Sequence, residues 1–250
     1  SGACGHLRVL EITSCGIVSW SQVAMLGAWA PSLEELCAAD NNFSDVTDVT
    51  AATSAKGNVE GFRSLRSLDV SETGLTYWQQ VMCFSDLPAL AILLLNHNRI
   101  SDVGDMATSP PPPTVGEPAA ATPPPPPSTP CLAKDSKQSP AVADGAAAAP
   151  AASASLSSGF PFAALEAVSL SGNRVGDWGA VDRLAGLSAL RSLRFSGNPV
   201  TSGLGASEAR AACIARLSRL QRVNGSECGS RERADAEKLY LRGLLQELDK

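Results

Sequence analysis

The chain has 250 residues, of which 44% are hydrophobic, and a formal net charge of −5. This length allows one or two domains with a sizeable core, and the negative charge argues against general nucleic-acid binding. There is no apolar run of about 18 residues, so we expect no membrane span, and no secretory signal appears. The seven cysteines are spread out without C-x-x-C pairs, which favours reduced thiols in a cytosolic protein.

A phrase of the form Leu-x-x-Leu-x-Leu-x-x-Asn-x-Ile recurs along the chain, with substitutes at each place. Its six copies are Leu7–Ile17, Leu33–Phe43, Leu65–Leu75, Leu90–Ile100, Leu165–Val175 and Leu190–Val200. Cys15 and Thr73 stand in the Asn place of the first and third copies. Repeats of about 20–29 residues with this spacing are typical of leucine-rich repeat proteins. The sequence therefore predicts an α/β fold, a leucine-rich repeat solenoid with a parallel concave sheet and a C-terminal helical cap.

Each Leu-x-Leu segment has a period of two, so it predicts a short strand whose apolar side chains point into the core. The Asn place turns the chain out of the strand, and a buried Asn bonds backbone groups that the bend leaves without ladder partners. Segments Ser21–Ala30, Gln79–Asp86 and Ala180–Ala185 then return along the convex side as helices or irregular turns.

Three copies also carry a tryptophan three residues after the Ile place and a valine three residues beyond it. These residues are Trp20, Trp78 and Trp178, followed by Val23, Val81 and Val181. The spacing places each pair on one face of a helical turn. We interpret them as core anchors under the convex side, in preference to a ligand cage, because they lie in separate repeats.

Residues 104–159 interrupt the repeats with proline runs at 110–113 and 123–127 and an alanine run at 146–149. Such a stretch buries too little apolar surface to offset its ordering entropy, so we expect a disordered insertion. The phrase resumes in phase at Phe160, which predicts a single leucine-rich domain over residues 1–250. The proline runs have two interpretations: a tolerated low-complexity insertion, which we favour, or a site for an SH3- or WW-type partner.

Residues 201–250 are predicted to form the C-terminal cap. Ser207–Leu217 has a helical pattern, with Ser207 as N-cap and Glu208 in the first turn. Leu217 to Asn224 has the pattern of a truncated last repeat, and Ser230–Leu248 predicts a second helix. The apolar face expected for that helix comprises Ala234, Leu241, Leu244, Leu245 and Leu248.

Catalytic and metal-binding signatures are scarce. The chain has two histidines, His6 and His97, and neither a GxxxxGK[ST] loop nor a GxGxxG motif after a strand. Zinc-like ligand spacing is also absent. We therefore expect a non-enzymatic protein without cofactor or metal, and the count of two histidines argues against a hydrolase with an unrecognised site.

The alternation of the strands predicts which side chains leave the core on the concave face. The candidate protein-binding residues are Glu11, Glu35, Asp40, Asp69, Glu72, Ile92, Leu94, Asn96, His97 and Arg194. The first zone is acidic, the middle is apolar with His97 beside it, and the last is small and polar with one arginine. Ile92 and Leu94 matter most, because an exposed aliphatic pair often anchors an interface. Two other interpretations stay open: the inserted loop covers Ile92 and Leu94, or the curvature of the sheet hides them from solvent.

Two segments of the chain resemble one family. The first includes Gly16, Ile17, Trp20, Val23, Pro31–Leu36, Asn41 and Asn42. The second includes Asn173, Trp178, Leu187–Leu193, Asn198–Val200, Ala209, Arg210, Ile214, Ala215, Leu217, Leu220, Asn224, Glu232, Arg233, Ala236, Glu237 and Tyr240. Both are similar to the leucine-rich domain of the tubulin-folding cofactor E family. The resemblance covers nearly the whole chain except residues 104–158, and its C-terminal part carries the most weight.

The resemblance implies a tubulin-folding chaperone scaffold that acts when αβ-tubulin heterodimers are assembled and dismantled. In that family the protein receives α-tubulin from cofactor B and then joins cofactors C and D with β-tubulin. The CAP-Gly and ubiquitin-like domains usual in the family do not fit within this chain, which we take for a fragment. A cytoplasmic, cytoskeleton-associated location follows. An alternative of another class stays open, a leucine-rich regulatory subunit of a phosphatase or other signalling enzyme.

Overall fold

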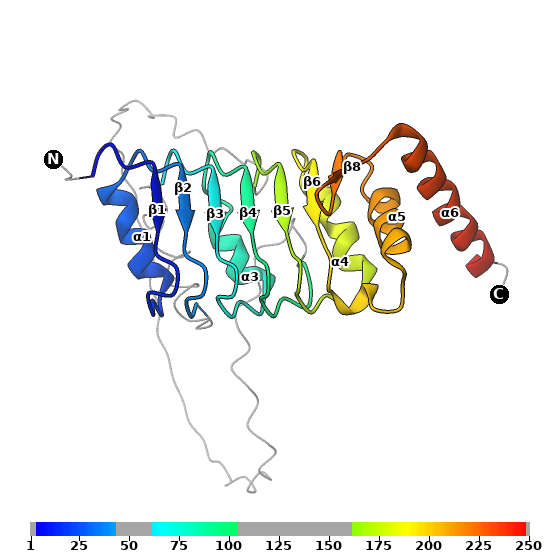
Figure 1. Ribbon diagram of the computed structural model, residues 1–250, viewed down its shortest axis with the longest axis horizontal. Helices are drawn as coiled ribbons and strands as arrows, with labels where there is room; N and C mark the ends of the chain where they lie inside the picture. The colour runs from blue at the N-terminus through cyan, green and yellow to red at the C-terminus, as the bar shows by residue number, and fades with distance from the viewer. Residues whose placement is uncertain (1–3, 44–61, 105–161, 249–250) are drawn as a thin grey trace, which may run out of the picture. The chain divides into compact units, whose positions relative to one another are not determined.

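The computed structural model describes residues 4–43, 62–104 and 162–248. The predicted insertion lies outside these residues, apart from Gly104. One three-residue strand per repeat forms the sheet, as β1 (Val9–Glu11), β2 (Glu35–Cys37), β3 (Ser67–Asp69), β4 (Ile92–Leu94), β5 (Ala167–Ser169) and β6 (Ser192–Arg194). These strands lie side by side in chain order (Figure 1) and all pair in parallel. The predicted leucine-rich repeat fold with its parallel sheet is confirmed.

The register keeps the repeats in phase across the sheet. The middle residue of each strand lies opposite the middle residue of the next, so Leu36 pairs with Leu68 and Leu68 with Leu93. Strands β4 and β5 pair in the same way, with Leu93 opposite Val168. The repeats before and after the proline-rich segment therefore share one sheet.

Buried asparagines connect neighbouring repeats, as the sequence predicts. The four are Asn41, Asn98, Asn173 and Asn198. The Oδ1 atom of Asn98 accepts a hydrogen bond from the backbone N–H of Leu75 at 3.0 Å, and its Nδ2 donates to the carbonyl of Val70 at 2.9 Å. Both partners belong to the preceding repeat. Each asparagine therefore satisfies backbone groups that the bend after the strand would leave unpaired.

The helices lie behind the sheet in Figure 1. They are α1 (Trp20–Trp29), α3 (Trp78–Val81) with the 3-10 turn η1 (Met82–Phe84), and α4 (Trp178–Arg183) with the 3-10 turn η2 (Leu184–Gly186). Each of the three helices begins at one of the predicted tryptophans. The two indoles of Trp20 and Trp78 are buried, Trp178 is half-buried, and the three paired valines are fully buried. Their predicted role as core anchors is confirmed.

The end of the solenoid differs from the prediction at the first helix boundary. After the 3-10 turn η3 (Pro199–Thr201), helix α5 covers Ala206–Arg216, and Gly205 takes the N-cap position. The side chain of Glu208 accepts a hydrogen bond from the Gly205 backbone N–H at 2.9 Å. The predicted N-cap, Ser207, is therefore wrong. Glu208 reaches back to bond the chain one turn earlier, so the helix begins before Ser207.

The truncated last repeat adds a seventh parallel strand, β7 (Arg222–Val223), which then folds back as an antiparallel hairpin with β8 (Ser226–Glu227). Asn224 and Gly225 form the turn with φ angles of 52° and 84°. Two consecutive positive φ angles are typical of the type I′ hairpin turn, which Asn-Gly favours. The sequence analysis missed this hairpin.

Helix α6 covers Ser230–Leu248, as predicted. Among the side chains described for this helix, Ala236 is buried, whereas Leu241, Leu244 and Leu245 are exposed. The apolar face predicted for this helix is therefore wrong: Glu232 and Arg233 form hydrogen bonds with α5, and the guanidinium of Arg216 lies over the ring of Tyr240 at 4.9 Å.

Candidate protein-binding face

Within residues 4–43, 62–104 and 162–248, no three His, Cys, Asp or Glu side chains gather where they could hold a metal ion. No helix in this part of the chain combines the length and apolarity that a membrane crossing requires. The sequence predicts a protein-binding face made of outward strand residues, and the structure has such an exposed surface on the sheet. It comprises the outward side chains of β1–β7 and of the turns that follow the strands, and is called the sheet face below.

The strand register arranges the sheet face in two rows. One row is Val9, Glu35, Ser67, Ile92, Ala167, Ser192 and Arg222. The other is Glu11, Cys37, Asp69, Leu94, Ser169 and Arg194. Six of the ten predicted residues therefore lie on the strands of this face, and the other four lie on the turns that follow them.

The acidic end of the sheet face lies over β1–β3. Glu11 and Glu35 are exposed, and Asp69 is half-buried and accepts a hydrogen bond from the Ser71 backbone N–H at 2.9 Å. Neither Glu35 nor Glu72 forms an ion pair or a side-chain hydrogen bond with another residue in the described part of the chain. Their carboxylates are left to solvent or to a partner.

Three predicted residues share the turn position after their strands. Asp40, Glu72 and His97 have φ angles of 52°, 58° and 54°, and all three are exposed. A left-handed conformation costs an L-residue about 1–2 kcal/mol, and the later repeats have Gly172 and Gly197 at this place. A Cβ atom added to Gly172 would lie 2.5 Å from Nδ1 of His97. The imidazole therefore covers the neighbouring turn.

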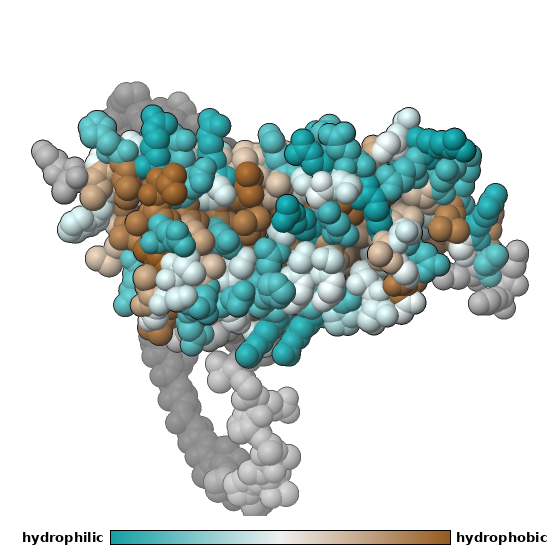
Figure 2. All heavy atoms as spheres, in the orientation of Figure 1, coloured by the Kyte–Doolittle hydropathy of each residue, from teal (hydrophilic) through white to brown (hydrophobic). Residues whose placement is uncertain are grey.

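The middle of the sheet face is apolar, as predicted. Ile92 is 39% exposed and Leu94 is half-buried, so neither side chain is removed from the surface. The sequence analysis missed Val9, which is 59% exposed in the same row as Ile92. Figure 2 shows apolar surface gathered over the β1–β4 side of this face and more hydrophilic surface over the later strands.

Asn96 has a structural role on this face. Its Oδ1 accepts a hydrogen bond from the Ser169 hydroxyl at 2.5 Å, and its Nδ2 donates to the Ser71 hydroxyl at 3.3 Å. Ser169, which the alternation places outward, is in fact buried. These bonds cross β3, β4 and β5 and leave the Asn96 amide less free to contact a partner.

The basic end of the sheet face lies over β6 and β7. Arg194 was predicted, and Arg222 was missed although it precedes Val223 as Glu35 precedes Leu36. Both arginine side chains are exposed, and neither forms an ion pair with a residue in the described ranges. The face therefore carries two positive charges on β6 and β7, one more than predicted, and Glu227 of β8 lies opposite Arg222 in the hairpin register.

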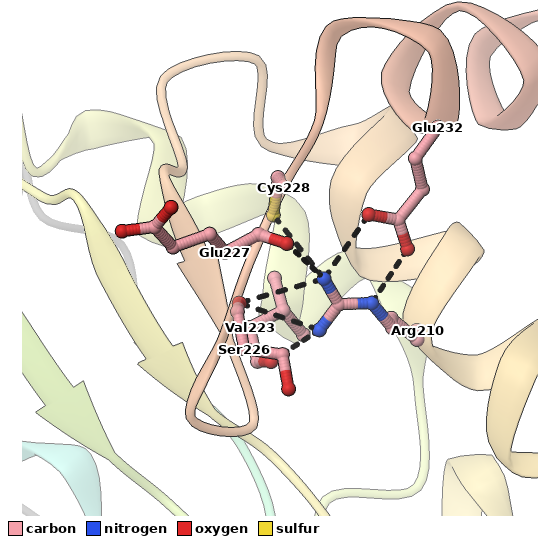
Figure 3. A network of polar contacts seen from close by, with 6 residues as sticks. All are labelled: Arg210, Val223, Ser226, Glu227, Cys228 and Glu232. Carbon is pink, nitrogen blue, oxygen red and sulfur yellow. Dashed lines mark hydrogen bonds and ion pairs between the residues drawn. The ribbon is translucent and has the colours of Figure 1, made fainter.

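A network of polar contacts fixes the hairpin that carries Arg222 (Figure 3). Arg210 on α5 donates hydrogen bonds to the backbone carbonyls of Val223, Ser226 and Glu227, the last at 2.8 Å. Its Nε also donates to Oε1 of Glu232 on α6 at 2.6 Å. This hydrogen bond lowers the pKa of the Glu232 carboxyl below its usual value. Arg210 thus joins α5, the hairpin and α6.

Comparison with known proteins gives the following result. No protein-family model matches the chain. The chain is 28% identical to tubulin-folding cofactor E of Arabidopsis thaliana, over 98% of this chain and 37% of that protein. It is 24% identical to tubulin-specific chaperone E of Mus musculus, over 95% of this chain and 44% of that protein. The chain therefore spans less than half the length of these relatives.

Among solved structures, the chain is similar to a chain in the crystal structure of the Drosophila melanogaster SNF/U2A′ complex. That match has 15% identity and a TM-score of 0.45, and covers 96% of this chain and 87% of the other. A likeness at this score carries no argument about function. The repeats and the C-terminal residues predicted a resemblance to one family, and the sequence matches agree with it. This leucine-rich repeat chain is similar over nearly its whole length to tubulin-folding cofactor E and tubulin-specific chaperone E.

Proposed function

We propose that this chain is a non-enzymatic scaffold of a tubulin-folding chaperone that acts in the cytoplasm. The observation that carries the proposal is its similarity to tubulin-folding cofactor E over 98% of its length. Because the chain matches only 37% of that protein, we assign it a binding role within the chaperone. Residues 1–250 act as one leucine-rich domain, with residues 104–159 as an insertion and 201–250 as the cap.

The sheet face is the surface we assign to the partner. Ile92 and Leu94 lie at its middle, and central apolar side chains that become desolvated contribute most of the energy of protein interfaces. The ligand is α-tubulin, with cofactors B, C and D and β-tubulin as companions in the larger complex. The scaffold assists the assembly and disassembly of the αβ-tubulin heterodimer by holding a subunit.

A double substitution tests this assignment. Ile92→Asp with Leu94→Asp places two charges where the partner would be desolvated, so capture of tubulin by the purified chain should weaken about tenfold or more. Met25→Asp is the single-charge control, because Met25 is an exposed apolar residue on α1 and its substitution leaves the sheet face intact. Circular dichroism and thermal melting verify that all variants stay folded.

The outcomes separate the candidate functions. Loss of tubulin capture in the double variant but not in Met25→Asp supports the proposal. Equal capture by both variants contradicts the assignment of the sheet face. If the wild-type chain retains a phosphatase from cytosol and no tubulin, the regulatory-subunit alternative replaces it.

A further inference from the structure

The charged side chains of the sheet face are sorted by sign along the sheet. Glu35 and Glu72 belong to the repeats of β2 and β3, and Arg194 and Arg222 lie on β6 and β7. Four strand steps separate β2 from β6, which is about 19 Å at about 4.8 Å per step. This exceeds the Debye length of about 8 Å at physiological salt. The two ends are therefore too far apart to neutralise each other.

Elsewhere in the described part of the chain, five ion pairs form. Arg8 pairs with Glu34 where the strands begin, and Arg216 pairs with Asp182 at 2.7 Å between α5 and α4. On the sheet face, Glu35, Glu72, Arg194 and Arg222 form no such pair with a described residue. Between them, the outward strand side chains of β4 and β5 are uncharged, with Ile92 exposed near the centre. The face thus carries acidic side chains and the exposed Val9 at its β1–β3 end, Ile92 near its centre, and basic side chains on β6 and β7.

We propose that the sheet face accepts its protein partner in one orientation only. Basic side chains of the partner lie over β1–β3, aliphatic side chains cover Ile92 and Leu94, and acidic side chains lie over β6 and β7. This inference rests on the proposed function for the identity of the partner. The reversed orientation brings like charges together at both ends, and such contacts are strongly unfavourable.

Charge reversal at each end tests the proposal with purified αβ-tubulin as the probe. The acidic-end variant is Glu35→Lys with Glu72→Lys, and the basic-end variant is Arg194→Glu with Arg222→Glu. Each should weaken capture about tenfold at low salt. The effect should shrink toward none at about 1 M salt, where the Debye length falls to about 3 Å.

Matched controls make the same changes of charge away from the sheet face. Asp86→Lys with Glu237→Lys matches the acidic-end variant, and Lys238→Glu with Arg242→Glu on α6 matches the basic-end variant. All four control residues are exposed, and none occupies an outward strand position. The controls should bind tubulin within about twofold of the wild-type chain, because net charge alone acts weakly at a distance.

Two peptides give a readout that does not depend on tubulin. A short lysine-rich peptide and a short glutamate-rich peptide, each with a central pair of leucines, are titrated into the wild-type chain and followed by amide NMR. The lysine-rich peptide should shift the amides of β1–β3, and the glutamate-rich peptide those of β6 and β7. Both should shift the amides of Ile92 and Leu94.

The outcomes distinguish the two proposals. If tubulin does not bind but the peptides map to opposite ends, the proposed function fails and the polarity of the face stands. If Ile92→Asp with Leu94→Asp abolishes tubulin capture while the charge-reversal variants match their controls, the orientation is refuted. Peptides that shift the same strands, or a wild-type chain that self-associates through this face in sedimentation experiments, also overturn it.

Discussion

Replacing Asn98 by alanine should cost more stability than any exposed substitution, because its side chain joins two repeats. The Oδ1 atom accepts hydrogen bonds from the backbone N–H groups of Thr73 and Leu75 at 3.1 and 3.0 Å. The Nδ2 atom donates to the carbonyls of Val70 and Leu95 at 2.9 and 3.1 Å. Asn98 is 4% exposed, so water cannot readily replace these bonds.

The expected loss follows from the groups left unpaired. A buried backbone group that loses its partner costs about 1–3 kcal/mol. Such costs are not additive, and neighbouring groups relax, so Asn98→Ala should lower the free energy of unfolding by about 3–5 kcal/mol. Asn98→Thr is the matched comparison, because the Thr73 hydroxyl donates to the Val70 carbonyl of its own repeat at 2.7 Å. By analogy, a threonine at position 98 would bond Leu95 and recover about 1–2 kcal/mol.

Urea unfolding followed by far-ultraviolet circular dichroism measures both variants against the wild-type chain. With a slope of about 1–3 kcal/mol per molar urea, Asn98→Ala should lower the midpoint by about 1 M or more, with Asn98→Thr between the two. A loss below about 1 kcal/mol for Asn98→Ala would refute the idea that the asparagine joins the repeats. The same holds if Asn98→Thr is the less stable variant.

Three further predictions concern the end of the chain and its thiols. Gly225→Ala should destabilise the chain by about 1–2 kcal/mol in the same urea assay, because Gly225 has a φ of 84°; an unchanged midpoint would contradict the hairpin turn. Hydrogen bonding to Arg210 lowers the pKa of Glu232 in the folded chain. The ionised Glu232 therefore stabilises the folded state at pH values above its unfolded pKa of about 4.3, and this stabilisation is lost as the pH falls through the lower folded pKa. Glu232→Gln should flatten the stability profile in that acid range, and an identical profile would show that the pair contributes nothing. Burial raises the pKa of the Cys213 thiol to about 12, whereas Cys15 is exposed; iodoacetamide at pH 8 should modify Cys15 far faster, as mass spectrometry of the peptides can test.

The repeats were predictable because each of their inward positions is defined by local chemistry. The apolar alternation of Leu-x-Leu allows one strand register with its leucines inside, and the asparagine needs the backbone groups of a bend. Leu68, Leu93 and Asn98 are all buried where the sequence places them. The outward residues follow from the same alternation, which explains why Glu35 and Ile92 lie on the sheet face.

The end of the solenoid was less predictable, for two different reasons. The sequence Asn224-Gly225 is a local signal for a hairpin turn, and both residues have positive φ angles in the structure. The interpretation of this segment as a truncated repeat did not use that signal. The buried face of α6, by contrast, has no local signal. Ala236 is buried because the bonds from Arg210 to Glu232, and from Arg233 to the Ile214 carbonyl, orient this helix on α5. The more hydrophobic Leu241 and Leu245 remain exposed, so hydropathy alone predicts the wrong face.

Strand alternation also separates the inward side chains, which stabilise the fold, from the outward side chains, which a partner can contact. In the inward ladder Leu36, Leu68 and Leu93 repeat one kind of side chain, whereas the adjacent outward row passes from Glu35 through Ile92 to Arg222. Outward substitutions usually change stability by less than about 0.5 kcal/mol, so folding places little constraint on the order of charges along the face. The charged positions of these strands change from acidic on β1–β3 to basic on β6 and β7, an order that the core does not require and that is consistent with a requirement set by the bound protein.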